Sequence, residues 1–310
     1  MKYTGSKTKM TDGHEIFIHK WISEKSDPNP KGIVQISHGM AEHAARYEAF
    51  AGELVDNGYL VYANDHRGHG KTAVSLGHIG FFAENNGWLR VVEDMHEITS
   101  MIRKSHPGLP VFMLGHSMGS FLLRTYMFLY GNQINGAIIS GTAGSPGILG
   151  DIGMMIANLE IKRKGLRGKS PLLHQLSFGG YNKAFKPART DFDWLSRDQE
   201  EVDKYMEDPF CGAVFTAGFY RDLLWGLKTI HRKNNIDRIP KDLPIFIFSG
   251  DKDPVGKNGK GVSQVYNSLK KNGIEDIQLS LYKDGRHEML NETNRHEVYQ
   301  DVITWLNNHL

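Results

Sequence analysis

The sequence predicts an α/β protein with a mostly parallel central sheet flanked by helices. Short apolar runs rich in β-branched residues alternate with longer amphipathic patterns of helical period, and this alternation is typical of β-α-β units. Charged residues make up 23% of the 310 residues and apolar residues 40%, which indicates a folded globular chain. This length allows one large domain or two ordinary ones.

The elements alternate along most of the chain. The expected strands are 14–22, 32–37, 60–64, 111–114, 136–140, 244–249 and 277–282. The expected helices are 47–56, 88–104, 121–129, 262–271 and 296–309. The alternation stops between about 142 and 241, where Gly, Pro, Arg and Lys interrupt amphipathic segments and no clear strand occurs. We therefore expect one core made of 1–141 and 242–310, with a helical cap, 142–241, inserted between two strands.

Composition excludes several classes of protein. The formal net charge of +2 is not that of a strongly basic nucleic-acid-binding protein, so no nucleic-acid partner is expected. A single cysteine, Cys211, excludes an intrachain disulfide and is expected to pack as a small apolar residue. The first ten residues carry positive charge without a following apolar segment, and no run of 18 apolar residues occurs. A cytoplasmic protein is the expectation.

One serine stands in a pattern that favours nucleophilic catalysis. Gly115-His116-Ser117-Met118-Gly119 fits G-x-S-x-G, with an apolar strand before it and a helical pattern after it. A strand that turns abruptly into a helix brings backbone close to backbone, so side chains must be absent on both sides of the serine. The alternative is a glycine-rich turn whose serine only caps the helix.

A nucleophilic serine needs an imidazole base and a carboxylate that orients it. In sheets of this kind these partners follow the serine in the order acid then histidine, each after a later strand. His287 follows the strand at 277–282, and we expect it to be the general base. Asp251 and Asp253 both follow the strand at 244–249. The spacing Gly-x-x-Asp favours Asp253 as the acid, and Asp251 is then a turn residue.

Acyl transfer also needs donors for the oxyanion that develops on the substrate. The backbone N–H of Met118, directly after the serine, is one expected donor. The strand at 32–37 leads into His38-Gly39-Met40, which makes the N–H of Met40 the second.

Several motifs together carry a resemblance to a known family. They are His38-Gly39-Met40-Ala41-Glu42-His43-Ala44-Ala45-Arg46-Tyr47, Asn64-Asp65-His66-Arg67-Gly68-His69-Gly70, the G-x-S-x-G pattern, Gly250-Asp251-Lys252-Asp253 and His287. From about residue 14 to its C-terminus the chain resembles α/β-hydrolases of the monoacylglycerol lipase and lysophospholipase family, least so in the inserted segment. The first motif is the most specific, because many hydrolases share the serine motif.

The resemblance implies an α/β-hydrolase fold with Ser117, Asp253 and His287 as the catalytic triad. It implies the N–H groups of Met40 and Met118 as the oxyanion hole, and a cap that shapes an acyl-chain tunnel. It also implies that Glu42 and Arg46 act around the catalytic loop and the polar head group of the substrate.

Two positions depart from the family pattern. Ser120 stands where the family often has a further glycine, one residue inside the expected helix. Leu290 stands where the mammalian-type lipases carry a second histidine near the glycerol, so the head group is left open.

Metal and phosphate sites are not expected. The histidines of His14-Glu15-Ile16-Phe17-Ile18-His19 are five apart and lie in an alternating strand pattern, whereas a zinc-binding HExxH helix needs them four apart. The spacing of His38, Glu42 and His43 misses the related H-x-x-E-H pattern by one residue. Residues 65–70 lack the Lys-Ser/Thr of a phosphate loop, and a structural loop braced by a buried Arg or His is the favoured interpretation.

The inserted segment contains a basic run, residues 161–169, after an apolar stretch, residues 148–159. This order suggests transient contact with an anionic membrane surface, and a solvated charged face is the alternative.

Together these patterns predict a serine hydrolase that cleaves carboxylic esters with a lipid-like acyl group through an acyl-enzyme, without a cofactor. A short-chain esterase or peptidase on the same fold is the alternative within the enzyme class, since specificity resides in the cap. A ligand-binding protein without turnover is the alternative outside it. Acyl-chain length, head group and oligomeric state are not specified by the sequence.

Overall fold

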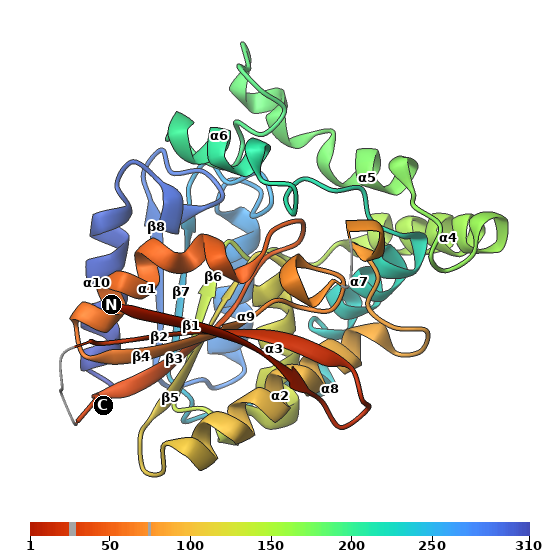
Figure 1. Ribbon diagram of the computed structural model, residues 1–310. Helices are drawn as coiled ribbons and strands as arrows, with labels where there is room; N and C mark the ends of the chain where they lie inside the picture. The colour runs from red at the N-terminus through yellow and green to blue at the C-terminus, as the bar shows by residue number, and fades with distance from the viewer. Residues whose placement is uncertain (25–28, 74–75) are drawn as a thin grey trace.

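A single sheet forms the centre of the computed structural model, which describes residues 1–24, 29–73 and 76–310 (Figure 1). Its strands are β1 (Lys2–Lys9), β2 (Glu15–Ile22), β3 (Gly32–Ser37), β4 (Tyr59–Asn64), β5 (Val111–His116), β6 (Gly136–Ser140), β7 (Ile245–Gly250) and β8 (Ile277–Tyr282). They lie in the order β1-β2-β4-β3-β5-β6-β7-β8. β2 is antiparallel to both of its neighbours, and the pairs from β4 to β8 are parallel.

Helices cover both faces of this sheet. On one face, α1 (Glu48–Asp56) and α10 (Arg295–Asn307) pack against alternate strand residues such as Val34 and Phe246. On the other, α2 (Gly87–Ser105), α3 (Met118–Tyr130) and α9 (Lys260–Lys271) pack against the remaining strand residues. Since helices cover both faces, β3, β5, β6 and β7 are buried along their whole length and have continuous apolar runs. The predicted fold class is confirmed.

The strand β1 was not expected from the sequence. Its side chains are almost all exposed, so Lys2–Lys9 has no apolar alternation that would indicate a strand. It forms because its backbone pairs with β2 from Lys2 opposite Ile22 to Lys9 opposite Glu15. The expected strands that the structure describes are all present, with bounds shifted by two residues or fewer.

Between β6 and β7 the chain leaves the sheet and forms helices. They are α4 (Gly147–Lys164), α5 (Pro171–Phe178), α6 (Gln199–Glu207), α7 (Ala217–Thr229) and α8 (Lys233–Ile236). In Figure 1, α4, α5 and α6 lie along the upper side of the molecule, above the sheet. None of the described helices is both long enough and apolar enough to cross a membrane.

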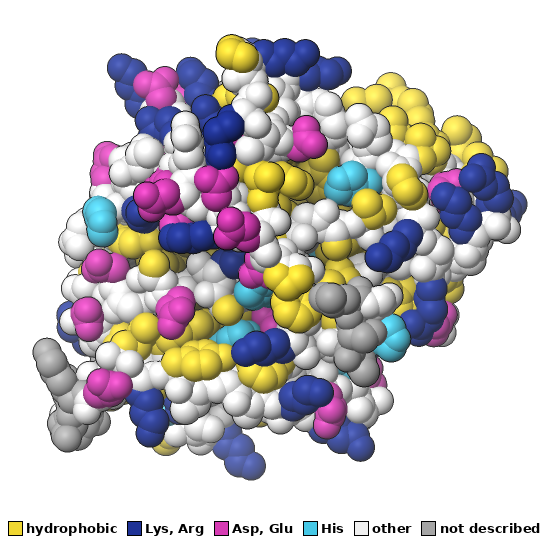
Figure 2. Space-filling view, turned by 45° about the horizontal axis from the view of Figure 1, so that its top comes forward, with side chains coloured by type: hydrophobic (Ala, Val, Ile, Leu, Met, Phe, Trp, Pro, Cys, Tyr) yellow, Lys and Arg dark blue, Asp and Glu magenta, His cyan; other side chains and the backbone are white. Residues whose placement is uncertain are grey.

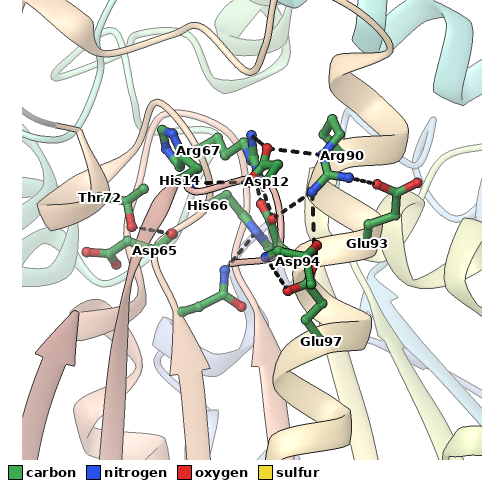
Figure 3. A network of polar contacts seen from close by, with 12 residues as sticks. Asp12, His14, Asp65, His66, Arg67, Thr72, Arg90, Glu93, Asp94 and Glu97 are labelled. Carbon is green, nitrogen blue, oxygen red and sulfur yellow. Dashed lines mark hydrogen bonds and ion pairs between the residues drawn. The ribbon is translucent and has the colours of Figure 1, made fainter. Parts of the chain in front are cut away.

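The loop at residues 65–70 is held by a buried ion-pair network (Figure 3). Arg67 donates two hydrogen bonds to Asp94 on α2, of 2.6 and 2.7 Å, and both side chains are buried. Its third nitrogen lies 2.7 Å from Asp12 in the β1–β2 turn, whose side chain is 32% exposed. Asp65 accepts the N–H groups of Ala44 and Lys71, at 2.9 and 2.7 Å. The predicted structural loop is confirmed, and it supports the segment that begins at His38.

The two aspartates that pair with Arg67 differ in burial, and this difference gives a stability prediction. Asp94→Ala leaves the buried guanidinium with only one half-exposed partner, so it should lower the free energy of unfolding by about 3 kcal/mol. Asp12→Ala removes the more exposed partner and should lower it by about 1 kcal/mol or less. Equilibrium unfolding in urea measures both. Equal losses in the two variants would contradict the assignment of Asp94 as the main partner.

Candidate active site

Ser117 lies in a sharp turn between β5 and α3. Its backbone has φ 52° and ψ −119°, a conformation that a non-glycine residue rarely adopts. A methyl group on Gly115 would overlap the carbonyl oxygen of Gly119, and one on Gly119 would overlap that of Ser37. The glycines of the motif are therefore required by backbone contact, as predicted. The Ser117 side chain is partly exposed at the carboxyl end of the sheet.

Ser120 fits where the family often has a glycine. It is fully buried one turn into α3, and its hydroxyl donates a hydrogen bond of 2.6 Å to the carbonyl of Ser117. The departure thus adds a contact to the turn.

Asp253 and His287 meet beside this turn. Nδ1 of His287 lies 3.0 Å from Oδ1 of Asp253, although the N–H does not point directly at the oxygen. Hydrogen bonds of this kind commonly tighten when a substrate binds. The carboxylate also accepts the N–H of Val255 at 2.8 Å and the hydroxyl of Ser249 at 3.0 Å, and it is fully buried. Asp251 is partly exposed and accepts the N–H of Asp284 at 2.8 Å. Of the two aspartates, the structure brings Asp253 to the histidine.

The pKa shifts of Asp253 and His287 are in the directions that base catalysis requires. Burial opposes ionisation of Asp253, but His287 and the hydrogen bonds from Val255 and Ser249 outweigh it and hold the pKa of the carboxyl below its usual range. Burial also opposes protonation of His287, yet Asp253 raises the pKa of the imidazole above its ordinary value. The aspartate is therefore the anion that stabilises a protonated His287.

Two further elements fix the His287 loop. The ring of His116, the residue before the serine, lies 4.7 Å from the His287 ring, so the serine turn and the His287 loop are adjacent. Burial and the neighbouring His287 lower the pKa of His116 to about 3, which keeps it neutral. From the inserted segment, the carbonyls of Trp194 and Leu195 accept the N–H groups of His287 and Glu288, at 3.3 and 2.7 Å. The segment between β6 and β7 therefore contacts the proposed base directly.

The loop after β3 packs against the serine. A methyl group on Gly39 would lie 3.2 Å from Cβ of Ser117, which places the next residue, Met40, near the hydroxyl. Within the described residues, neither the N–H of Met40 nor that of Met118 is used in a hydrogen bond. Ala41 has φ 59°, and its carbonyl accepts the hydroxyl of Tyr205 at 2.9 Å. Two free donors thus belong to segments that meet at Ser117.

Glu42 and Arg46 are buried and contact each other. Glu42 accepts the N–H of Gly39 at 2.6 Å, the hydroxyl of Tyr47 at 2.9 Å and a guanidinium N–H of Arg46 at 2.8 Å. Arg46 also donates two hydrogen bonds of 2.7 Å to Glu288. These contacts brace the segment after β3, residues 38–47, which contains the expected oxyanion donor Met40 and is called the oxyanion loop below. Contact of Glu42 or Arg46 with a substrate stays a prediction. No motif in the sequence singles out Glu288, although it directly follows His287.

Other polar clusters lie outside the proposed triad. His43, Asp208 and Cys211 place their possible ligand atoms within 4.8 Å of one another, and His43 Nε2 lies 2.7 Å from Asp208 Oδ2. This contact joins the oxyanion loop to the segment after α6. A cavity of about 290 Å³ opens where α2 begins, between α4 and α7, and none of its lining residues belongs to the triad.

The strand order and the serine turn between β5 and α3 define an α/β-hydrolase. The chain belongs to the family described as serine aminopeptidase, S33, whose model matches residues 28–294.

Relatives agree with this placement. The chain is 30% identical to a monoacylglycerol lipase of Mycolicibacterium smegmatis over 92% of this chain and 91% of that protein. It is 27% identical to the monoglyceride lipase of Homo sapiens over 95% of this chain and 88% of that protein. A carboxyl esterase from Bacillus coagulans, solved in complex with glycerol, is 27% identical with a TM-score of 0.91, covering 100% of this chain and 99% of that one. The resemblance inferred from the motifs is confirmed.

Proposed function

We propose that the protein is a serine hydrolase that cleaves carboxylic esters of lipid-like substrates, such as monoacylglycerols, with Ser117, Asp253 and His287 as its triad. The observation that carries this proposal is the strained Ser117 turn beside a buried His287 whose Nδ1 lies 3.0 Å from Asp253. Simple ligand binding requires neither a strained serine nor a polarised imidazole.

The geometry supports an acyl-enzyme mechanism. Nε2 of His287 takes the hydroxyl proton as Ser117 Oγ attacks the ester carbonyl, and Asp253 stabilises the imidazolium that forms. The N–H groups of Met40 and Met118 donate to the oxyanion. When the tetrahedral intermediate collapses, the C–O bond to the alcohol breaks and His287 returns its proton to the leaving oxygen. Water, deprotonated by His287, then attacks the acyl carbon, the bond from that carbon to Ser117 Oγ breaks, and His287 returns the proton to Oγ.

The substrate class rests on the relatives and on residues 142–241, which we propose act as a cap. Two relatives are named for hydrolysis of monoacylglycerols, and a related esterase binds glycerol in its crystal structure. An ester with a small polar head group is therefore the better candidate.

A substrate panel tests this assignment. Wild type should hydrolyse monoacylglycerols with kcat/KM rising toward medium or long acyl chains, because longer chains bury more apolar area, about 0.8 kcal/mol per CH₂. The same series on lysophospholipids separates the head groups. Aminoacyl-arylamides and short p-nitrophenyl esters complete the panel. Turnover of only short esters or arylamides would leave the triad in place and overturn the lipid assignment.

We also propose that the cap contacts membrane surfaces through α4 and α5. The apolar side chains that these helices expose are Ile148, Leu149, Ile152, Met155, Leu159, Leu172 and Leu176, at 44 to 78%. Basic residues follow at once in Lys162, Arg163, Lys164, Arg167 and Lys169. Figure 2 shows hydrophobic side chains gathered over this end of the cap, with Lys and Arg beside them. Exposed apolar residues next to cations are what an anionic bilayer surface binds.

Vesicle sedimentation tests this contact. Replacing Ile148 and Leu149 together by serine should weaken binding to phosphatidylglycerol vesicles about tenfold or more, since two large apolar side chains no longer enter the interface. Met101→Ser, which removes an exposed apolar side chain from α2, is the matched control and should bind like wild type. Equal binding by the cap variant and wild type would contradict the proposal. The cytoplasmic location expected from the sequence stays a prediction.

A further inference from the structure

We infer that Glu288 is a positioning residue of this active site, which ties the His287 loop to the oxyanion loop and supplies a negative charge that favours the protonated imidazole during catalysis. The inference rests on the proposed function, because it assumes that His287 is the general base.

The contacts between the two loops begin at the residue directly after the proposed base. Glu288 follows His287 in the chain, is 5% exposed, and accepts hydrogen bonds of 2.7 Å from two guanidinium nitrogens of Arg46. Its Oε2 also accepts the amide of Asn291 at 2.9 Å. A bidentate pair of this kind fixes orientation as well as distance, because two parallel hydrogen bonds define a plane. The backbone at His287 is therefore held against the segment that carries Arg46.

These contacts continue to the residue before Met40 in the oxyanion loop. Arg46 shares its guanidinium with Glu42, at 2.8 Å, and Glu42 in turn accepts the N–H of Gly39 at 2.6 Å. Gly39 precedes Met40, the proposed donor to the oxyanion. The chain of contacts from Glu288 through Arg46 and Glu42 to Gly39 thus joins the base to the oxyanion hole without passing through the substrate.

The charges of Glu288, Arg46 and Glu42 do not cancel. Two carboxylates face one guanidinium, so with both carboxylates ionised the network carries one net negative charge at a buried position. Burial opposes ionisation of Glu288, but Arg46 outweighs it and lowers the pKa of that carboxyl to about 2. Burial raises the pKa of Glu42 from its ordinary value. After Asp253, both carboxylates contribute to the raised pKa of His287.

Other described titratable groups also face this site. They are Asp253 after β7, His116 from β5, Arg46 and Tyr47 from the oxyanion loop, and Tyr181, Tyr205 and Cys211 from the inserted segment. Among the described groups that act on His287, Glu288 alone both adjoins it in the chain and contacts the oxyanion loop.

The test compares pH profiles of kcat/KM for a water-soluble ester. Glu288→Gln keeps the shape of the side chain and removes its charge. We expect kcat to fall about tenfold or more, because loop placement loosens, with KM little changed. The acid limb should move to lower pH by about one unit, because an anion near His287 is lost.

Two variants separate charge from packing. Glu292→Gln neutralises another buried carboxylate of the same loop, which pairs with Arg197 at 2.9 Å, and it should leave the acid limb in place. The double variant Arg46→Gln with Glu288→Gln removes both sides of the bidentate pair and leaves Glu42 without a cation, where burial favours its neutral form. Its kcat should stay low, and its acid limb should stay at the position found in Glu288→Gln, because no anion replaces Glu288. Removing both partners leaves no unpaired buried charge, so this variant is informative even where Glu288→Gln does not fold.

The result that overturns the inference is a folded Glu288→Gln enzyme with kcat within twofold of wild type and an unmoved acid limb, or a double variant with wild-type kcat. Failure of the proposed function looks different. In that case the Ser117→Ala variant keeps wild-type activity, and replacing His287 does not move the acid limb of the pH profile.

Discussion

Ser117→Ala should reduce kcat/KM for ester hydrolysis by about 10⁵-fold or more, because the hydroxyl that forms the acyl-enzyme is lost. Residual activity should come only from the oxyanion donors and from substrate binding. Initial rates on a monoacylglycerol and on a p-nitrophenyl ester, corrected for the uncatalysed reaction, measure the loss. The free energy of unfolding should change little, since alanine keeps the Cβ and the lost hydroxyl belongs to a partly exposed side chain.

Ser120→Ala is the matched control for this measurement. It removes a serine hydroxyl three residues away that donates to the carbonyl of Ser117 and takes no part in the proposed chemistry. Its activity should stay within about tenfold of wild type, as expected for loss of one supporting hydrogen bond. Comparable losses in the two variants would mean that the turn, rather than the Ser117 hydroxyl, is what hydrolysis requires.

Asp253→Asn should lower kcat by about 10⁴-fold, because the amide no longer stabilises the imidazolium and favours the wrong tautomer of His287. The pH dependence has a defined sign. His287 must be neutral to act as the base, and Asp253 raises the pKa of His287. Wild-type kcat/KM should therefore fall as pH decreases through a pKa above the ordinary histidine value. In the variant, the acid limb of the residual activity should move to lower pH.

Asp251→Asn provides the comparison for the acid. Asp251 is partly exposed and contacts the backbone of Asp284, so its neutralisation should change kcat by about threefold or less. A large loss in Asp251→Asn together with a small one in Asp253→Asn would reverse the assignment that both the spacing and the structure favour.

The sequence was most informative where one residue type satisfies a strict local requirement. Gly115 and Gly119 flank a turn in which no side chain fits, so a motif in the sequence corresponds directly to a backbone contact. The contact between Asp253 and His287 could be predicted because both follow strands of a parallel sheet, whose carboxyl ends meet at one edge. The strands of the buried sheet were predicted for a similar reason, since burial on both faces leaves continuous apolar runs.

The rest depends on contacts between segments distant in sequence. β1 has no apolar pattern because almost all of its side chains are exposed, and only its pairing with β2 makes it a strand. The pairing of Arg46 with Glu288 joins residues 242 positions apart, which no local spacing indicates. The resemblance pointed to Glu42 and Arg46. Their role as a brace is evident only in the folded chain, where Glu288 contacts Arg46.

The most direct test of the central claim is covalent labelling of the nucleophile. A long-chain alkyl fluorophosphonate should form a bond from phosphorus to Ser117 Oγ with loss of fluoride, and intact mass should show one adduct per chain. Peptide mapping should place this adduct on Ser117, and Ser117→Ala should remain unlabelled. Folded wild-type protein that stays unlabelled, or an adduct on another residue that persists in Ser117→Ala, would contradict the account of this protein as a serine hydrolase.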